Sequence, residues 1–222
     1  MMRHSTLQFW FFCLLAISLP TLSCLATVIP SSMFGDNMVL QRDMPVPVWG
    51  AASPGERVTV TFAGHTVTAR ADQQGKWRVF LPALTASDEG RKMQIKGENT
   101  ITFEDVLIGE VWVCSGQSNM QYGWGKQSLP MFNWGGDAEL TALVEDARKK
   151  PIRSYTVRTD VSFIPKENCR EQWSTDVSGS AVAFGLSYYL HEAIDVPIAV
   201  IVACRYAYCG KPVVNLVNGT MR

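Results

Sequence analysis

The residue with the clearest chemical potential is Ser118, which follows a short apolar run and a turn. Residues 111–114 are apolar, long enough for a buried strand and too short for a helix. Ser115-Gly116 favours a sharp turn, and Ser118-Asn119 suits a turn or a helix start. On a tight turn at the carboxyl end of a parallel strand, a serine hydroxyl is exposed beside backbone N–H groups that can face an oxyanion. An ordinary surface turn is the alternative, and it is the commoner one for an isolated G-x-S.

The surrounding residues form a longer motif. The run Gly109-Glu-Val-Trp-Val-Cys-Ser-Gly-Gln-Ser-Asn-Met120 resembles the nucleophile block of the sialate O-acetylesterase family, carbohydrate esterases related to the SGNH hydrolases. The resemblance implies that Ser118 is the nucleophile and that its own N–H is one oxyanion donor. It implies that Gly116, Gln117 and Asn119 shape the turn, and that the substrate is an O-acetylated carbohydrate.

The resemblance covers roughly residues 33 to 200. Residues 33–50 resemble the entry sequence that the family carries before the nucleophile, and Gly75-Lys-Trp77 resembles the G-x-W of its sandwich hairpin. Residues 180–198 resemble a helix and strand of the family.

The chain departs from the family pattern after this strand. Family members carry a Trp-Gly-Gly-Thr type turn there, whose glycine N–H is taken as a second oxyanion donor. Here Tyr206 and Ala207 replace the two glycines, and the sequence leaves open whether Gly210 restores the turn in a shifted register. The family's Q-G-E-S-N and Asp/His blocks would lie beyond Arg222. The resemblance therefore implies the N-terminal portion of a longer esterase, or a truncated, weakly active or inactive copy.

Composition narrows the range of partners and cofactors. Twenty basic and twenty acidic residues cancel, so no global field favours nucleic acid or an anionic membrane. Only three histidines are present, far apart, and no Cys/His grouping has metal-ligand spacing. We expect no metal, no cofactor and no nucleic-acid partner.

The first 26 residues are typical of a secretory signal peptide. Arg3 and His4 precede an apolar stretch, residues 9–19, that is too short to span a bilayer comfortably. We expect cleavage after Ala26, a secreted or periplasmic protein, and no stable membrane span after signal removal. A lipid anchor on Cys24 is the less favoured alternative, because Thr21 stands where lipoprotein signals usually have leucine.

The cysteines of the mature chain favour structural roles. Cys114, within an apolar strand, is expected to be a buried small residue rather than a reactive thiol. Cys204 and Cys209 are close enough in sequence to form a disulfide, but their spacing alone does not establish that they do.

Residues 27–108 predict an antiparallel β-sandwich domain. Short apolar runs and strands alternating with period two are separated by turn residues, as at Val58, Val60 and Phe62. His65 is expected at an exposed strand end. Trp49 and Trp77 are expected in the core, although they could stack on sugars.

Residues 109–222 alternate strands and helices, which predicts a parallel α/β sheet. By resemblance this is a partial SGNH-like hydrolase domain, so the fold class is α/β, an antiparallel β-sandwich followed by an incomplete SGNH-like domain. A loop after Met120 carries Trp124 and Trp134, which either wall a sugar pocket or only pack. A central strand is expected over 196–203.

Two amphipathic helices are expected in this half. The first has its apolar face at Leu140, Leu143, Val144 and Ala147, and a strand follows at 152–157. The second has its apolar face at Val182, Leu186, Tyr189, Leu190 and Ala193. His191 is expected on the surface near the second helix's C-terminus.

Two hypotheses follow from these observations. The first is an exported carbohydrate O-acetylesterase that uses Ser118 and a histidine from outside this chain as base. The alternative is a truncated, non-catalytic protein whose sandwich and Trp-rich loop bind a glycan.

Overall fold

The computed structural model describes residues 27–117, 120, 138–157, 172–175 and 180–204. Several sequence predictions fall outside these residues: the signal peptide, Ser118, Asn119, Trp124, Trp134, and the turn after Cys204. They stay predictions.

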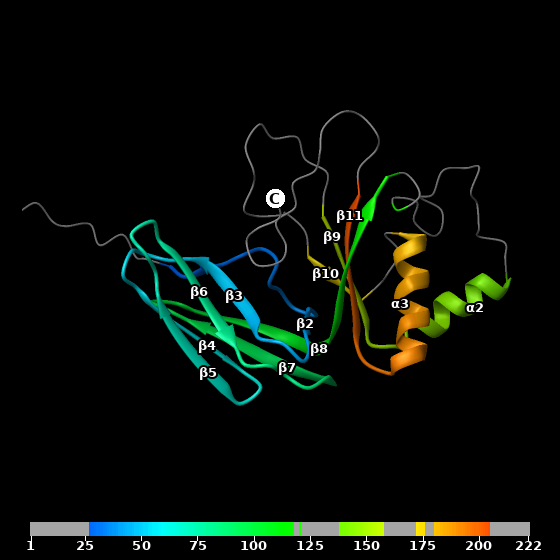
Figure 1. The fold of residues 1–222 in the computed structure, drawn as a ribbon, viewed down its shortest axis with the longest axis horizontal. Coiled ribbons are helices and arrows are strands. Elements are labelled where there is room, and N and C mark those ends of the chain that lie inside the picture. The colour runs from blue at the N-terminus through cyan, green and yellow to red at the C-terminus, as the bar shows by residue number, and fades with distance from the viewer. Residues whose placement is uncertain (1–26, 118–119, 121–137, 158–171, 176–179, 205–222) are drawn as a thin grey trace, which may run out of the picture.

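The N-terminal half is built from two packed sheets (Figure 1). One sheet contains β1 (Ile29–Pro30), β3 (Val46–Ala51) and β6 (Lys76–Leu81). The other contains β4 (Arg57–Phe62), β5 (His65–Arg70), β7 (Ser87–Lys96) and β8 (Thr100–Gly116), and the short β2 (Val39–Gln41) pairs with β8. All pairs are antiparallel except β2 with β8, which is parallel.

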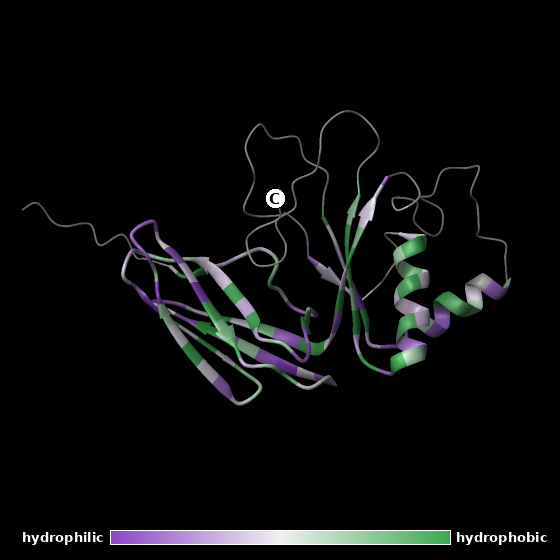
Figure 2. Cartoon of the chain, in the orientation of Figure 1, coloured by the Kyte–Doolittle hydropathy of each residue, from purple (hydrophilic) through white to green (hydrophobic). Residues whose placement is uncertain are grey.

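Alternation of side chains explains how these strands form a core. Figure 2 shows hydrophobic and hydrophilic residues alternating along the sandwich strands. The inward residues are fully or almost fully buried, among them Val48, Val58, Val60, Trp77, Val79, Met93 and Ile95. Trp77 also donates its indole N–H to the Ala51 carbonyl at 3.0 Å. The prediction of a core Trp77 is confirmed, while Trp49 is half-buried and packs edge-on against Phe34 at 4.8 Å between ring centroids.

Strand β8 links the sandwich to the second half of the molecule. The sequence indicated two strands, at 100–108 and 111–114, whereas the structure has one strand of 17 residues. Its first part pairs antiparallel with β7, and from Glu110 to Gly116 it pairs parallel with β11. Gly109 lies at the change of partner, where a Cβ atom would overlap the carbonyl group of Pro197. A glycine there allows the chain to continue as a strand instead of turning away.

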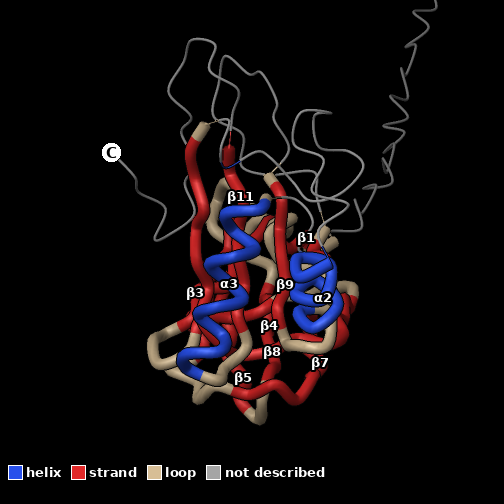
Figure 3. Tube along the Cα trace, turned by 90° about the vertical axis from the view of Figure 1, so that its right-hand side faces the viewer, coloured by secondary structure: helices blue, strands red, loops and turns tan. Residues whose placement is uncertain are grey.

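The second half is an α/β layer (Figure 1). Strands β9 (Ile152–Thr156) and β11 (Ile198–Cys204) are parallel, and β10 (Trp173–Ser174) pairs antiparallel with β9. The strand order is β10-β9-β11-β8, so β11 is the central parallel strand that its apolar run predicted. Helices α2 (Ala138–Ala147) and α3 (Ala181–Ile194) lie on one face of these strands (Figure 3). The chain is thus mixed α/β, with an antiparallel β-rich part and a parallel α/β part.

Helix α3 packs through a different face from the one its sequence indicated. The residues buried against the sheet are Ala183, Phe184, Ser187 and His191. Val182, Leu186 and Tyr189 are 50%, 40% and 65% exposed, so the predicted apolar face is wrong. Small residues let the helix approach the sheet closely, and the Ser187 hydroxyl is satisfied by donating to the Phe184 carbonyl at 2.8 Å.

The two halves share one hydrophobic core. Tyr155, Trp173, Ala199 and Ile201 belong to the same buried cluster as the sandwich residues. The Trp173 indole N–H also donates to the Met33 carbonyl at 2.8 Å. The expected domain boundary between residues 108 and 109 falls inside β8, and the division stays a prediction.

Candidate active site

The parallel strands end together at one edge of the sheet. Strands β8 and β11 stay in register to the pair Gly116–Cys204, and Thr156 at the end of β9 pairs with Val202 of β11. Carboxyl ends of parallel strands form the usual ligand-binding edge of an open α/β sheet. Gly116 and Gln117 lie at this edge, and both are exposed. The parallel environment expected for this strand is confirmed.

A backbone hydrogen bond joins two residues just beyond the end of β8. The Met120 N–H donates to the Gln117 carbonyl at 2.9 Å. Met120 is helical, and this bond ties it to the residue that follows β8. In the sequence, Ser118 and Asn119 stand between these two residues.

The N-terminal end of α3 lies at the same edge. Helix α3 precedes β11 and runs antiparallel to it, and it contacts both β11 and β9 (Figure 3). Ser180 is its N-cap, with its hydroxyl accepting the Ala183 N–H at 3.1 Å. The end of a helix that carries free N–H groups is partially positive, which favours negative charge nearby.

The strand before the turn is less buried than its sequence indicated. Cys114 is 4% exposed, as predicted, and faces the helices. Trp112 and Val113 are 44% and 38% exposed. Among the described residues, β11 is the only strand that pairs with residues 110–116, which leaves the other side of β8 open. The expectation of a buried strand is therefore confirmed at Cys114 and wrong at Trp112 and Val113.

The two cysteines near the edge are free thiols. Burial raises the pKa of the Cys114 thiol above its ordinary value of 9.0. Burial also raises the pKa of Cys204, against a smaller opposing backbone hydrogen bond. Both thiols are therefore protonated at neutral pH and are poor nucleophiles. Cys209 lies outside the described residues.

Neither histidine of the described residues is placed to activate a group at this edge. His65 begins β5 in the sandwich and is exposed, as predicted. His191 is only 8% exposed, so the prediction of a surface histidine is wrong; its Nδ1–H donates to the Val196 carbonyl at 2.9 Å. It lies eleven residues along α3 from Ser180, roughly 16 Å at the helical rise of 1.5 Å per residue.

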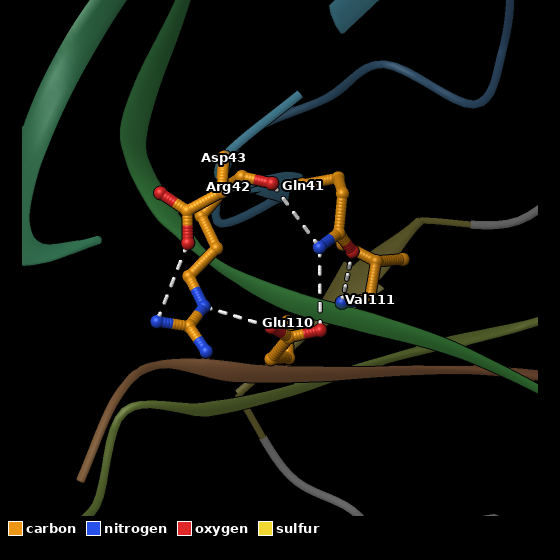
Figure 4. Close-up of polar contacts among 5 residues, drawn as sticks. All are labelled: Gln41, Arg42, Asp43, Glu110 and Val111. Carbon is orange, nitrogen blue, oxygen red and sulfur yellow. Dashed lines mark hydrogen bonds and ion pairs between the residues drawn. The ribbon is translucent and has the colours of Figure 1, made fainter. Parts of the chain in front are cut away.

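A polar cluster holds β8 at the start of its parallel part (Figure 4). Arg42 Nε donates to Glu110 at 2.7 Å, and Gln41 Nε2 donates to the other Glu110 oxygen at 3.2 Å. Gln41 Oε1 accepts the Val111 N–H at 2.9 Å. The Arg42 hydrogen bond lowers the pKa of Glu110, with a smaller effect from Gln41 and opposition from burial. Sequence reasoning missed this cluster, because nothing in the residue pattern pairs positions so far apart.

The described residues contain no group of three or more His, Cys, Asp or Glu side chains that could hold a metal ion. None of the helices in this part of the chain is long and apolar enough to cross a membrane.

Comparison with known proteins finds similar chains among esterases. Sialate O-acetylesterase of Mus musculus is 26% identical over 192 residues, 77% of this chain, and that of Homo sapiens is 26% identical over 204 residues, 82% of this chain. The crystal structure of a carbohydrate acetylesterase from Xanthomonas citri covers 80% of this chain with a TM-score of 0.69 and 28% identity. Over most of its length the chain is similar to sialate O-acetylesterases and to a carbohydrate acetylesterase.

This sialate O-acetylesterase-like chain is short beside its relatives. It spans 34% and 37% of the mouse and human proteins, and 40% of the Xanthomonas chain. No protein-family profile matches it.

Proposed function

We propose that the protein is an exported carbohydrate O-acetylesterase in which Ser118 is the nucleophile. The observation that carries the proposal is the carboxyl edge of a parallel sheet, where exposed Gln117 is hydrogen-bonded to Met120 and Ser118 stands between them in the sequence. Similarity to sialate O-acetylesterases and to a carbohydrate acetylesterase supports an acetyl ester as the bond that is cleaved and a carbohydrate as the substrate.

The proposed reaction proceeds through an acetyl-serine. The Ser118 oxygen attacks the acetyl carbonyl carbon while its proton passes to a base, and the Ser118 N–H donates to the resulting oxyanion. Collapse of this intermediate breaks the bond to the sugar oxygen, which takes the proton from the base. Water then attacks the acetyl-serine, releases acetate and restores the hydroxyl.

The base in this scheme is a histidine from outside residues 1–222. His65 is in the sandwich and His191 is bonded at the far end of α3, so neither suits the role. His4, the third histidine of the sequence, lies within the proposed signal peptide.

The test is release of acetate from p-nitrophenyl acetate and O-acetylated sialic acid by the full-length natural polypeptide. Ser118→Ala is expected to lower kcat by several orders of magnitude, as loss of a nucleophile does. The matched control is Ser115→Ala, which removes an exposed hydroxyl from the same strand. An unchanged rate in Ser118→Ala would show that the serine assignment is wrong.

A second candidate is a non-catalytic glycan-binding protein. It is favoured by the residues that follow β11, where Tyr206 and Ala207 stand in place of the family's glycines. Glycan affinity of the natural polypeptide without acetate release would support it. Absence of measurable glycan affinity would exclude it.

A further inference from the structure

The described residues on either side of Ser118 and Asn119 are both tied to regular structure. On one side, Gly116 is held by its pairing with Cys204 of β11. On the other side, Met120 is partly buried and packs against the cluster between the helices and the sheet. The two residues lie next to each other, since a Cβ at Gly116 would be in ordinary contact with the Met120 Cβ at 3.4 Å. Met120 is therefore held in place close to the end of β8.

The Met120 side chain also contacts a buried hydroxyl. Ser180 Oγ donates its proton to Met120 Sδ at 3.3 Å. The same oxygen accepts the Ala183 N–H at 3.1 Å, which caps α3. Ser180 is completely buried, so water does not compete for either contact. One hydroxyl thus connects the start of α3 to the residue two places after Ser118.

These two contacts restrict which residue type can stand at position 180. Aspartate or glycine would suit a helix N-cap, but neither carries a donor for the thioether. Serine and threonine supply both an acceptor for the helix N–H and an O–H donor. A cap alone would not require this combination.

We propose that Ser180 is a positioning residue for the nucleophile turn and that it acts through Met120. The proposal rests on the proposed function of Ser118. When the Ser180–Met120 contact is lost, Met120 is held less firmly, and the Ser118 oxygen, two residues earlier in the chain, is misplaced. Because a displacement of about 1 Å can cost up to a hundredfold in rate, the effect falls on kcat more than on KM.

The experiment compares acetate release and urea unfolding of the full-length natural polypeptide with Ser180→Ala, Ser180→Thr and Met120→Leu. Met120→Leu conserves volume and leaves the α3 cap in place, so it separates positioning from helix stability. We expect Ser180→Ala and Met120→Leu each to lower kcat by about tenfold with KM within about twofold. Ser180→Thr is expected to retain most of the activity.

The matched control is Ser187→Ala. Ser187 is also completely buried on α3, and its hydroxyl contacts the Phe184 carbonyl, not Met120. Ser187→Ala is expected to lower stability without changing kcat. The double variant Ser180→Ala/Met120→Leu is expected to lose no more than the larger single loss, because both changes break one contact.

Two results distinguish failure of this inference from failure of the proposed function. If Ser118→Ala abolishes hydrolysis while Met120→Leu and Ser180→Ala keep kcat within twofold, Ser180 is only a helix cap. If Ser180→Ala does not fold, the kcat of Met120→Leu decides the question alone. If Ser118→Ala hydrolyses as fast as the natural protein, both proposals fall.

Discussion

The side-chain carbonyl of Gln41 accepts the backbone N–H of Val111 at 2.9 Å, which is the kind of contact that a neighbouring strand would make. Val111 lies two residues beyond Gly109, the last residue of β8 that pairs with β2. A side-chain amide thus extends the pairing of β8 into its parallel part. This contact holds β8 at the point where it leaves the sandwich and begins to pair with β11.

Removing this amide is expected to destabilise the protein. In Gln41→Met, the length of the side chain is kept but the half-buried Val111 N–H loses its partner. We expect the free energy of unfolding in urea to fall by about 1–2 kcal/mol. Gln94→Met, which changes an exposed glutamine on β7, is the control and is expected to stay within about 0.5 kcal/mol. Equal effects of the two substitutions would contradict this role of Gln41.

The Glu110 carboxylate predicts a pH dependence of stability. Its pKa is lowered below the ordinary value of 4.5, mainly by the hydrogen bond from Arg42. A lowered pKa means that its stabilising contribution is complete above the ordinary value and is lost as the pH falls through the lowered one. The difference in unfolding free energy between the natural protein and Glu110→Gln should therefore shrink below pH 4.5.

Urea unfolding at neutral pH and in steps below pH 4.5 measures this difference. Glu98→Gln, an exposed glutamate in the turn between β7 and β8, is the control. A difference for Glu110→Gln that stays constant across the range would show that the ion pair does not govern the acid side of the stability curve.

Gly109 is expected to tolerate no side chain. The backbone of Pro197 approaches so closely that a Cβ would overlap its carbonyl group. Gly109→Ala should cost about 1–3 kcal/mol in thermal or urea unfolding, the usual range for overpacking. Gly185→Ala is the matched control, since a Cβ there meets no atom within 4 Å and alanine favours a helix. A stabilising effect at both positions would contradict the close approach.

Export is expected to remove residues 1–26. N-terminal sequencing or intact mass of the exported protein should give Thr27 as the first residue. A chain beginning at Cys24 with a lipid mass added would establish the anchored alternative, and an intact Met1 on the exported protein would contradict both.

Periodicity predicted the strands and helices well but did not predict how they meet. The alternation at Val58, Val60 and Phe62 indicated a buried sandwich face, and the apolar run of β11 indicated a central strand; both are confirmed. Helix α3 has two faces that could pack against the sheet, one with large apolar residues and one with smaller ones. The sheet covers Ala183 and Ser187 because small side chains allow closer packing, which a count of large apolar residues does not reveal.

The sequence predicted those parts of the candidate site whose residues are close together in the chain. The run from Gly109 to Met120 indicated the strand, and the parallel pairing and exposed end of that strand are as expected. Contacts between distant positions were not predictable. Ser180 lies sixty residues from Met120, and Gln41 lies seventy from Val111, so neither contact leaves a periodic pattern.

The account depends most on the reactivity of Ser118. The most direct measurement is treatment of the full-length natural polypeptide with a fluorophosphonate, followed by peptide mass spectrometry. The account predicts one phosphonyl adduct on Ser118, absent in Ser118→Ala and present in Ser115→Ala. An adduct on another residue, or none under conditions that label a known serine esterase, would contradict it.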